Sequence, residues 1–90
     1  MDNTTKVLRV KGSTSSISLA STVAHSVYAN ESISLRAIGA AAVNQAVKAL
    51  AIAQSYVGAK GMRISVIPGF ADVEMEDGTV TAITLRLLID

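Results

Sequence analysis

The feature that most constrains this chain is an alanine-rich segment, residues 37–57, with the sequence AIGAAAVNQAVKALAIAQSYV. Apolar residues recur in it at the three-and-four spacing of a helix, which predicts one long helix that begins after Gly39. Alanine has a high helix propensity and lets a neighbouring backbone approach closely, so this helix suits tight packing against a sheet or a second subunit. The predicted buried stripe consists of Val43, Ala46, Val47, Leu50, Ala53 and Val57.

Composition narrows the class of protein. The alanine-rich segment is not expected to cross a membrane, because Asn44, Lys48 and Gln54 would be buried in hydrocarbon. The chain has no cysteine, which excludes disulfides, thiolate zinc sites and cysteine nucleophiles. Its 90 residues suffice for one core, so we expect a single domain, 1–90, with residues 1–5 flexible. The N-terminus lacks the apolar run of a signal peptide, which favours the cytoplasm.

The first half of the chain predicts a strand, a helix and a second strand. Residues 6–11 alternate between apolar and basic side chains, as a strand with one basic face would. A helix follows, with its N-cap at Ser15 or Ser16, and the second strand is expected over 32–38. The predicted apolar face of this first helix consists of Ile17, Ala20, Val23, Ala24, Val27 and Tyr28.

The last third predicts two strands joined by a turn at Asp77-Gly78. The first of them, beginning at residue 62, is expected to be interrupted at Pro68, as an edge strand or a strand with a bulge would be. A two-residue turn at Asp77-Gly78 would leave Ile83 on the face of the glutamates. We therefore expect a longer loop or a bulge, which pairs Val73 with Ile83.

The element order βαβαββ predicts an α+β fold, a two-layer sandwich in which two helices cover one face of a four-stranded mixed sheet.

No group of residues typical of a catalytic site is evident in this sequence. His25 is the only histidine and lies in the middle of a helix, where a partly exposed side chain is expected. The carboxylates at residues 72, 74, 76 and 77 alternate as on a solvated outer face. Gly39 lacks the further glycines of a Rossmann motif and a Walker lysine. We therefore assign no catalytic residue, metal ligand or cofactor, and no enzyme activity is expected.

The charges divide unevenly along the chain. Residues 1–63 carry seven Lys or Arg side chains against Asp2 and Glu31, whereas residues 64–90 carry Arg86 against five carboxylates. This division predicts an electrically two-sided domain. Aromatic residues for base stacking are few, so contacts to the phosphate backbone of duplex DNA or RNA are the expected mode of binding. The candidate nucleic-acid-binding residues are Lys6, Arg9, Lys11, Arg36, Asn44, Lys48, Lys60 and Arg63.

Several strings of this sequence together resemble one known family. AIGAAAVNQAVKALAIA (37–53), VIPGFADVEME (66–76) and TAITLRL (81–87) resemble the stage V sporulation protein S (SpoVS) family, and the opening VLRVKGSTSS is in register with it. That family is similar in fold to Alba, an archaeal chromatin protein and RNA binder, and to the C-terminal domain of a bacterial translation initiation factor. The resemblance implies an Alba-like sheet of order 1-2-4-3, a homodimer, nucleic-acid binding and a role in sporulation or development.

Three departures from the family pattern concern charge or the presumed phosphate loop. Residues 15–18 are Ser-Ser-Ile-Ser where a Pro-Asn pair is expected. Gln54 stands where the family often has a basic residue, and the usual basic position near Val80 is missing. The lost charges would weaken contacts to phosphate.

Two interpretations of function stay open. The first is a non-enzymatic, Alba-like regulator that binds nucleic acid. The second is a protein-interaction or assembly module that uses the alanine-rich helix or the last two strands and binds no nucleic acid. A small-anion site at Gly39 is a third alternative. In a homodimer, Ile52 and Tyr56 are expected to meet the second subunit, because they lie opposite the Leu50 stripe of the helix.

Overall fold

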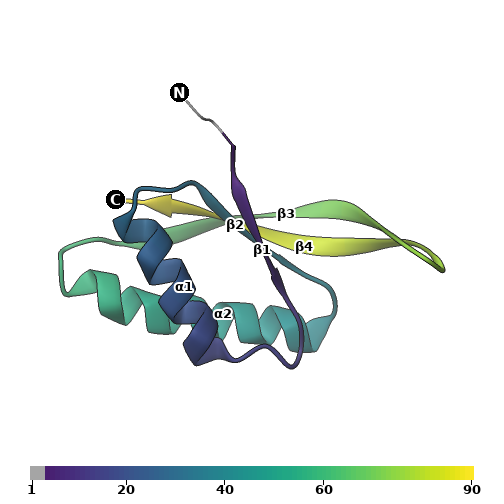
Figure 1. The fold of residues 1–90 in the computed structure, drawn as a ribbon, viewed down its shortest axis with the longest axis horizontal. Coiled ribbons are helices and arrows are strands. Elements are labelled where there is room, and N and C mark those ends of the chain that lie inside the picture. Colours follow the sequence, from purple (N-terminus) through teal and green to yellow (C-terminus); the bar gives the residue numbers. More distant parts are fainter. Residues whose placement is uncertain (1–3) are drawn as a thin grey trace.

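The chain folds into a four-stranded sheet with both helices on one of its faces (Figure 1). The computed structural model describes residues 4–90. Strand β1 pairs in parallel with β2, and β4 pairs antiparallel with both β2 and β3, so the sheet order is β1-β2-β4-β3. The predicted α+β sandwich and its order βαβαββ are confirmed. The elements are β1 (Lys6–Val10), α1 (Ser16–Tyr28), β2 (Ile33–Ala37), α2 (Ala40–Gly58), β3 (Ile64–Met75) and β4 (Gly78–Ile89).

The predicted flexible segment, residues 1–5, lies mostly outside the described residues, which begin at Thr4. The hydroxyl of Thr5 lies 3.2 Å from the hydroxyl of Ser32. The backbone N–H of Lys6 donates to the carbonyl of Ser32 at 2.8 Å. The described residues before β1 and at its start are therefore bonded to the loop that precedes β2.

Helix α2 begins after an N-cap at Gly39, as predicted. The residues of its buried stripe have smaller side chains than expected. Val47 is exposed and does not belong to the stripe. The helix packs against α1 as well as against the sheet, and only small side chains fit where both neighbours approach it closely. The buried residues of α2 are Ala42, Ala46, Ala49, Ala53 and Val57.

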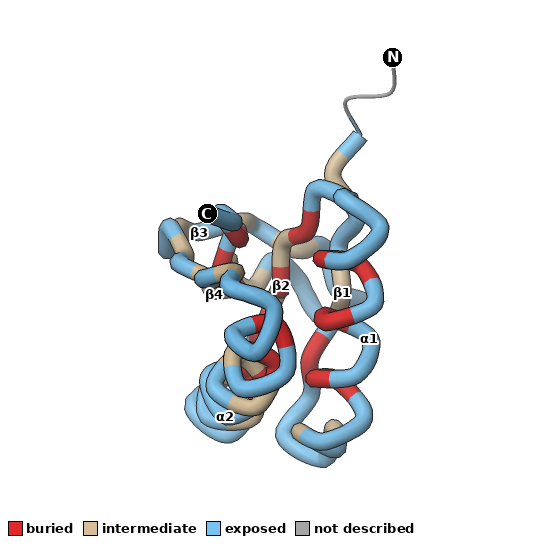
Figure 2. Tube along the Cα trace, turned by 90° about the vertical axis from the view of Figure 1, so that its left-hand side faces the viewer, coloured by how far each residue is buried: buried red, intermediate tan, exposed pale blue. Residues whose placement is uncertain are grey.

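Helix α1 is capped by Ser15, whose hydroxyl accepts a 3.2 Å hydrogen bond from the backbone N–H of Ser18. Ile17 is 65% exposed, so its predicted place on the buried face is wrong, and Leu19 is buried instead. Ile17 lies in the first turn of the helix, two residues after the N-cap Ser15. Figure 2 shows the buried residues gathered where the two helices and the sheet face one another.

Strand β3 is an edge strand that runs through Pro68 without a break, so the predicted interruption is wrong. Arg63 and Asp90 exchange both backbone hydrogen bonds, at 3.0 and 2.9 Å. Because hydrogen-bonded and non-hydrogen-bonded pairs alternate in an antiparallel ladder, the Pro68–Leu85 pair is of the second kind. The N–H that proline lacks would have pointed to the open edge, so the ladder to β4 loses no bond.

The register of the β3–β4 hairpin differs from the predicted one. Val73 pairs with Val80, so the expected pairing with Ile83 is wrong. The Met75–Gly78 pair closes a two-residue turn at residues 76–77, one position earlier than predicted. Gly78 adopts a φ of 126°, a conformation that favours glycine and places the turn there.

This register puts Ile83 on the same face as Asp72 and Glu74, the arrangement that the predicted register avoids. The predicted register would be required only if the helix layer covered the whole length of the hairpin. Figure 1 shows instead that the tip of the hairpin projects past both helices. The two carboxylates are therefore exposed although they share a face with core residues.

The face of β3 whose side chains are buried changes along the strand. Val66 is partly buried on the helix side, whereas Phe70, on that same side, is 78% exposed. Beyond Phe70 the partly buried residues are Ala71 and Val73, which face away from the helices, and Ala82 opposite Ala71 is fully buried. The outer half of the hairpin thus buries side chains on the sheet face that carries no helix.

We predict that Ala46→Leu destabilises the fold by about 1–3 kcal/mol, because Ala46 is fully buried and extra methylenes force the tightly packed helices apart. Ala40→Leu, in the exposed first turn of the same helix, is the matched control and should change stability by less than about 0.5 kcal/mol. Urea unfolding followed by circular dichroism measures both. Equal stability of the two variants would contradict the close packing of α2.

Candidate nucleic-acid interface

Arg9 and Arg36 lie side by side on the sheet face that carries no helix. They are direct partners in the parallel register of β1 and β2, and Arg36 alternates with the buried residues Leu35 and Ala37. Adjacent strands are about 4.8 Å apart, so the two guanidinium groups start from neighbouring positions. Like charges placed opposite each other destabilise a sheet, so this pair needs an anion or solvent to offset its repulsion.

Arg36 is the more enclosed of the two arginines. Its side chain is partly buried, and its Nε is shielded from solvent without a hydrogen-bond partner in the described structure. Buried polar atoms almost always form a hydrogen bond, so a buried donor without an acceptor on a charged group is an exception. No carboxylate within residues 4–90 forms a salt bridge with Arg9 or Arg36.

Lys11 follows directly after β1, in a tight turn. Its backbone N–H donates to the Thr14 hydroxyl at 2.8 Å, and the Thr14 N–H donates to the Lys11 carbonyl at 3.0 Å. The turn is held against α2 by the side-chain amide of Gln45, which donates to the Thr14 carbonyl at 2.7 Å. Gly12 packs so closely on the helix that an added Cβ would lie 2.9 Å from the Cβ of Ala41.

The three side chains Arg9, Lys11 and Arg36, which we call the basic cluster, line one cavity of about 350 Å³. Val10, Gly12 and Ile38 contribute to its walls, and Val73 and Met75 of the hairpin line it as well. The cavity thus combines the end of β1, the turn after it, the end of β2 and the tip of a hairpin more than 30 residues later in the chain.

Two further candidate residues lie on the exposed side of α2. Lys48 Nζ is 3.3 Å from the Gln45 side-chain oxygen, and Gln45 in turn holds the turn that carries Lys11. Asn44 is exposed on the same helix, near its N-terminal end. These side chains flank the basic cluster across the turn, on the helix side of the molecule.

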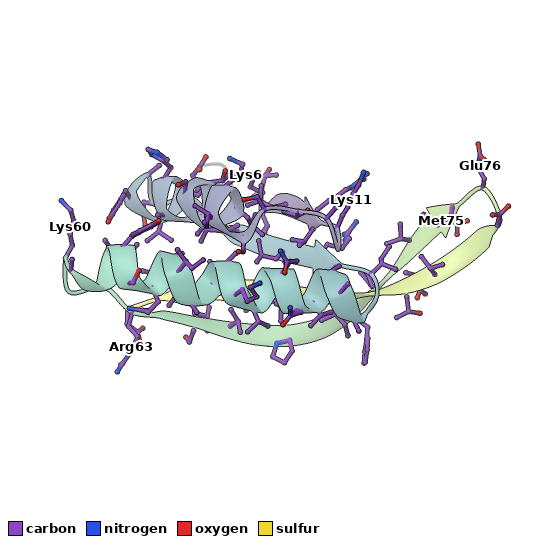
Figure 3. All side chains as sticks on the ribbon, turned by 90° about the horizontal axis from the view of Figure 1, so that it is seen from below. Lys6, Lys11, Lys60, Arg63, Met75 and Glu76 are labelled. Atoms are coloured by element: carbon purple, nitrogen blue, oxygen red, sulfur yellow. The ribbon has the colours of Figure 1, made fainter. Side chains whose placement is uncertain are left out.

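The other three candidates are not brought to the basic cluster. Lys6 forms a 3.9 Å salt bridge with Glu31, and Arg63 forms one of 3.5 Å with Asp90. Lys60 lies over the ring of Tyr28, 5.7 Å from its centroid. Lys60 and Arg63 follow the C-terminal end of α2, whose 19 residues at about 1.5 Å each place it roughly 27 Å from the end near Lys11. Figure 3 shows Lys60 and Arg63 at the end of the molecule opposite Met75.

Val73 and Met75 are the residues of this site that sequence reasoning missed. Their alternation with the glutamates predicts that they are buried in the core under the helices. In the structure they lie instead on the sheet face that carries no helix. The neighbouring carboxylates turn to the other face, where Asp72 accepts from the Thr81 hydroxyl at 3.4 Å and Glu74 accepts from the Thr79 hydroxyl at 3.1 Å. The cavity therefore has cationic and apolar walls although the hairpin is acidic.

A second surface lies between α2 and the edge strand β3. It is a groove of about 310 Å³ whose walls include Val47, Leu50 and Val66. Val47 is exposed within it, and Phe70 is exposed farther along β3, on the same face of the strand as Val66. By contrast, Ile52 packs partly buried against the core, and the Tyr56 carbonyl accepts a 3.2 Å hydrogen bond from the Tyr28 hydroxyl.

Two classes of site are absent from the described residues. No three His, Cys, Asp or Glu side chains within residues 4–90 are grouped as metal ligands would be. Within the same range, neither helix is both long enough and apolar enough to cross a membrane. His25 is exposed on α1, as expected from its sequence position.

Comparison with solved structures defines the class of fold. The chain is similar to Alba from Thermoplasma volcanium, with a TM-score of 0.60 and 12% sequence identity over 97% of this chain and 99% of that one. This likeness shows an Alba-like fold. At the level of sequence, the model of the Stage V sporulation protein S (SpoVS) family matches residues 6–90. The chain belongs to the SpoVS family, as its motifs indicate.

We predict that Gly12→Ala destabilises the protein by about 1–3 kcal/mol, because Ala41 is fixed on a helix and cannot move away from the added methyl group. Ser13→Ala, at the exposed neighbouring position, should leave stability within about 0.5 kcal/mol of the wild type. Thermal unfolding of both variants provides the comparison. A wild-type melting temperature for Gly12→Ala would show that the turn is free to shift on α2.

Proposed function

We propose that this protein is a non-enzymatic cytoplasmic regulator of sporulation or development that binds the phosphate backbone of DNA or RNA. The observation that carries the proposal is the basic cluster, in which Arg9, Lys11 and Arg36 converge without a salt bridge in the described structure. Membership of a sporulation family and the Alba-like fold support it.

The geometry favours phosphate over other partners of this surface. Arginine presents a planar fork of N–H donors that matches the oxygens of a phosphate, and two such forks start from adjacent strands here. Lys48 and Asn44 extend the proposed interface onto α2. Lys6 and Arg63 are already paired with carboxylates, and Lys60 lies at the far end of α2, so we leave these three out of the interface.

The acidic hairpin limits where a nucleic acid can lie. Its exposed carboxylates at residues 72, 74, 76 and 77 repel phosphate, and no lysine or arginine lies between residues 64 and 85. A nucleic acid therefore approaches the basic cluster and the turn at Lys11 without following the hairpin. Such binding depends on counterion release and should be independent of sequence.

The test is the salt dependence of binding to duplex DNA and RNA, measured by fluorescence anisotropy. Each phosphate neutralised contributes about −0.9 to the slope of log affinity against log salt for B-DNA. We predict that the double variant Arg9→Glu/Lys11→Glu reduces the magnitude of this slope by about two and weakens binding to all sequences alike. The matched control, Lys60→Glu/Arg63→Glu, changes the net charge equally at the other end of the molecule and should leave the slope near wild type.

Loss of folding does not explain the expected effect, because the carboxylate introduced by Arg9→Glu would lie opposite Arg36 and replace a repulsive pair with an attractive one. The melting temperature of the double variant should therefore equal or exceed that of the wild type. Equal loss of binding in both double variants would refute the proposed interface. Absence of binding to duplex or single strand at low salt would favour the interaction-module interpretation.

Self-association is the second proposal, and the groove between α2 and β3 favours it. The outer edge of β3 has no neighbouring strand in the described structure along its 12 residues, and its segment 64–71, ISVIPGFA, carries no charge. Natural proteins usually protect such an edge with charges or cover it. We propose that a second copy of the chain covers it in a two-fold homodimer, with Val47 and Phe70 in the interface. This surface replaces the one predicted around Ile52 and Tyr56, which partly faces the core and α1.

We predict that Phe70→Glu converts the protein from dimer to monomer at micromolar concentration, because a charge would be buried in the apolar interface. Ile17→Glu is the control, since Ile17 is also a large, exposed apolar residue, but it lies on α1 and does not line the groove. Sedimentation velocity distinguishes the two masses. A wild type that is monomeric, or a Phe70→Glu variant that stays dimeric, would exclude this interface.

A further inference from the structure

The cavity at the basic cluster has the properties of a small-ligand site in addition to those of a backbone contact. Its volume of about 350 Å³ lies at the lower end of the range for small-molecule pockets, about 300–1,000 Å³. No carboxylate contributes to its lining, whereas three cationic side chains do. It is formed on the sheet face opposite the helices, between the end of β1 and the hairpin, and so is separate from the groove proposed for self-association.

The charges in this cavity are suited to a doubly charged anion. A phosphate monoester carries about −1.5 to −2 charges at neutral pH and offers three terminal acceptor oxygens. Arg36 lines the cavity and its Nε has no acceptor in the described structure, so the terminal N–H groups of its guanidinium are available to donate to an oxygen of the anion. An internal phosphodiester has one charge, so it offsets less of the charge of the three cationic side chains than a phosphate monoester does.

The remaining walls are apolar. Ile38 comes from the segment after β2, and Val73 and Met75 come from the hairpin. These aliphatic and thioether side chains can contact a sugar or the face of a planar group, and the thioether of methionine adapts to irregular shapes. The cavity therefore combines a cationic side for phosphate with an apolar side for the group that the phosphate is attached to.

We propose that this cavity binds a phosphate monoester attached to a small apolar or planar group, of the size of a nucleoside monophosphate. The same chemistry has two sources, a free nucleotide and the 5′-phosphate end of a nucleic-acid strand. The inference shares Arg9, Lys11 and Arg36 with the proposed function, and it adds a preference for a terminal phosphate that backbone binding does not require.

The experiment uses the full-length wild type and two tryptophan variants that keep every charge. Met75→Trp places a large side chain in the cavity, and Leu88→Trp is its control on the same face of the hairpin, outside the cavity, at a residue of similar exposure. Calorimetric titration with adenosine 5′-monophosphate should give a single site in the wild type and in Leu88→Trp. Met75→Trp should lose at least about tenfold in affinity, because the cavity no longer admits the ligand.

Arg36→Lys provides a second variant, because it keeps the charge and removes the planar fork of guanidinium N–H donors. It should also lose about tenfold in affinity for the monophosphate, the size of effect expected for a hydrogen bond to a charged group. In the wild type, the Nε–H resonance of Arg36 should shift on addition of the monophosphate and stay in place on addition of adenosine. An unchanged resonance, or equal affinity of the wild type and Met75→Trp, would overturn the inference.

Short single strands with a 5′-phosphate or a 5′-hydroxyl distinguish the two sources. Tighter binding of the phosphorylated strand, by about tenfold, identifies a strand end as the ligand. Equal binding of the two strands, together with binding of the monophosphate, identifies a free nucleotide. If the monophosphate does not bind and the strands bind equally, the inference fails while the proposed backbone binding stands. If the monophosphate binds and no nucleic acid does, the proposed function fails while the inference stands.

Discussion

The close approach of α2 to its neighbours is the constraint on which the rest of this structure depends. Four of its five buried residues are alanines, so the helix can approach α1 and the sheet at once. Both helices then fit on a single face of a narrow sheet (Figure 2). The other face is left without a covering layer, which is why it can carry arginines directly on β1 and β2. The packing of small residues on the helix-covered face of the sheet thus leaves the opposite face free to carry charged side chains.

The length of the hairpin has an equally direct consequence. Strands β3 and β4 each have 12 residues, whereas β1 and β2 have 5, so the hairpin extends past the sheet that the helices cover. Beyond the helices, burial no longer decides which side of β3 is apolar. The hairpin instead buries Val73 and Ala82 on the open face and turns Asp72 and Glu74 to the other. A cavity with cationic and apolar walls results, although the hairpin itself is the most acidic part of the chain.

Much of the fold follows from periodicity alone, because the long elements have unambiguous patterns. The order βαβαββ, the helix start after Gly39 and the edge position of β3 at Pro68 are examples. The errors share one cause, which is that position relative to the helix layer is not written in local pattern. Ile17 and Val47 fit an apolar stripe yet are exposed, and the predicted hairpin register places Val73 on the face of Ile83, under the helices, whereas Val73 lies on the open face. The pairing of Arg9 with Arg36 is likewise inaccessible to local pattern, because it depends on the parallel register of two strands separated by a helix.

The distribution of charge in space also differs from the distribution along the chain. Lysines and arginines of the first 63 residues suggest one basic side, but three of the seven are paired with carboxylates or lie at the far end of α2. The basic cluster has only three members, and no carboxylate lines the cavity that they share. An acidic hairpin beside it repels any polyanion that would extend along β3 and β4. Under the proposed binding, such a surface would discriminate by geometry: the forks of Arg9 and Arg36 would both contact a terminal phosphate in the cavity, whereas a backbone that passes across the cavity would meet only part of the same charge.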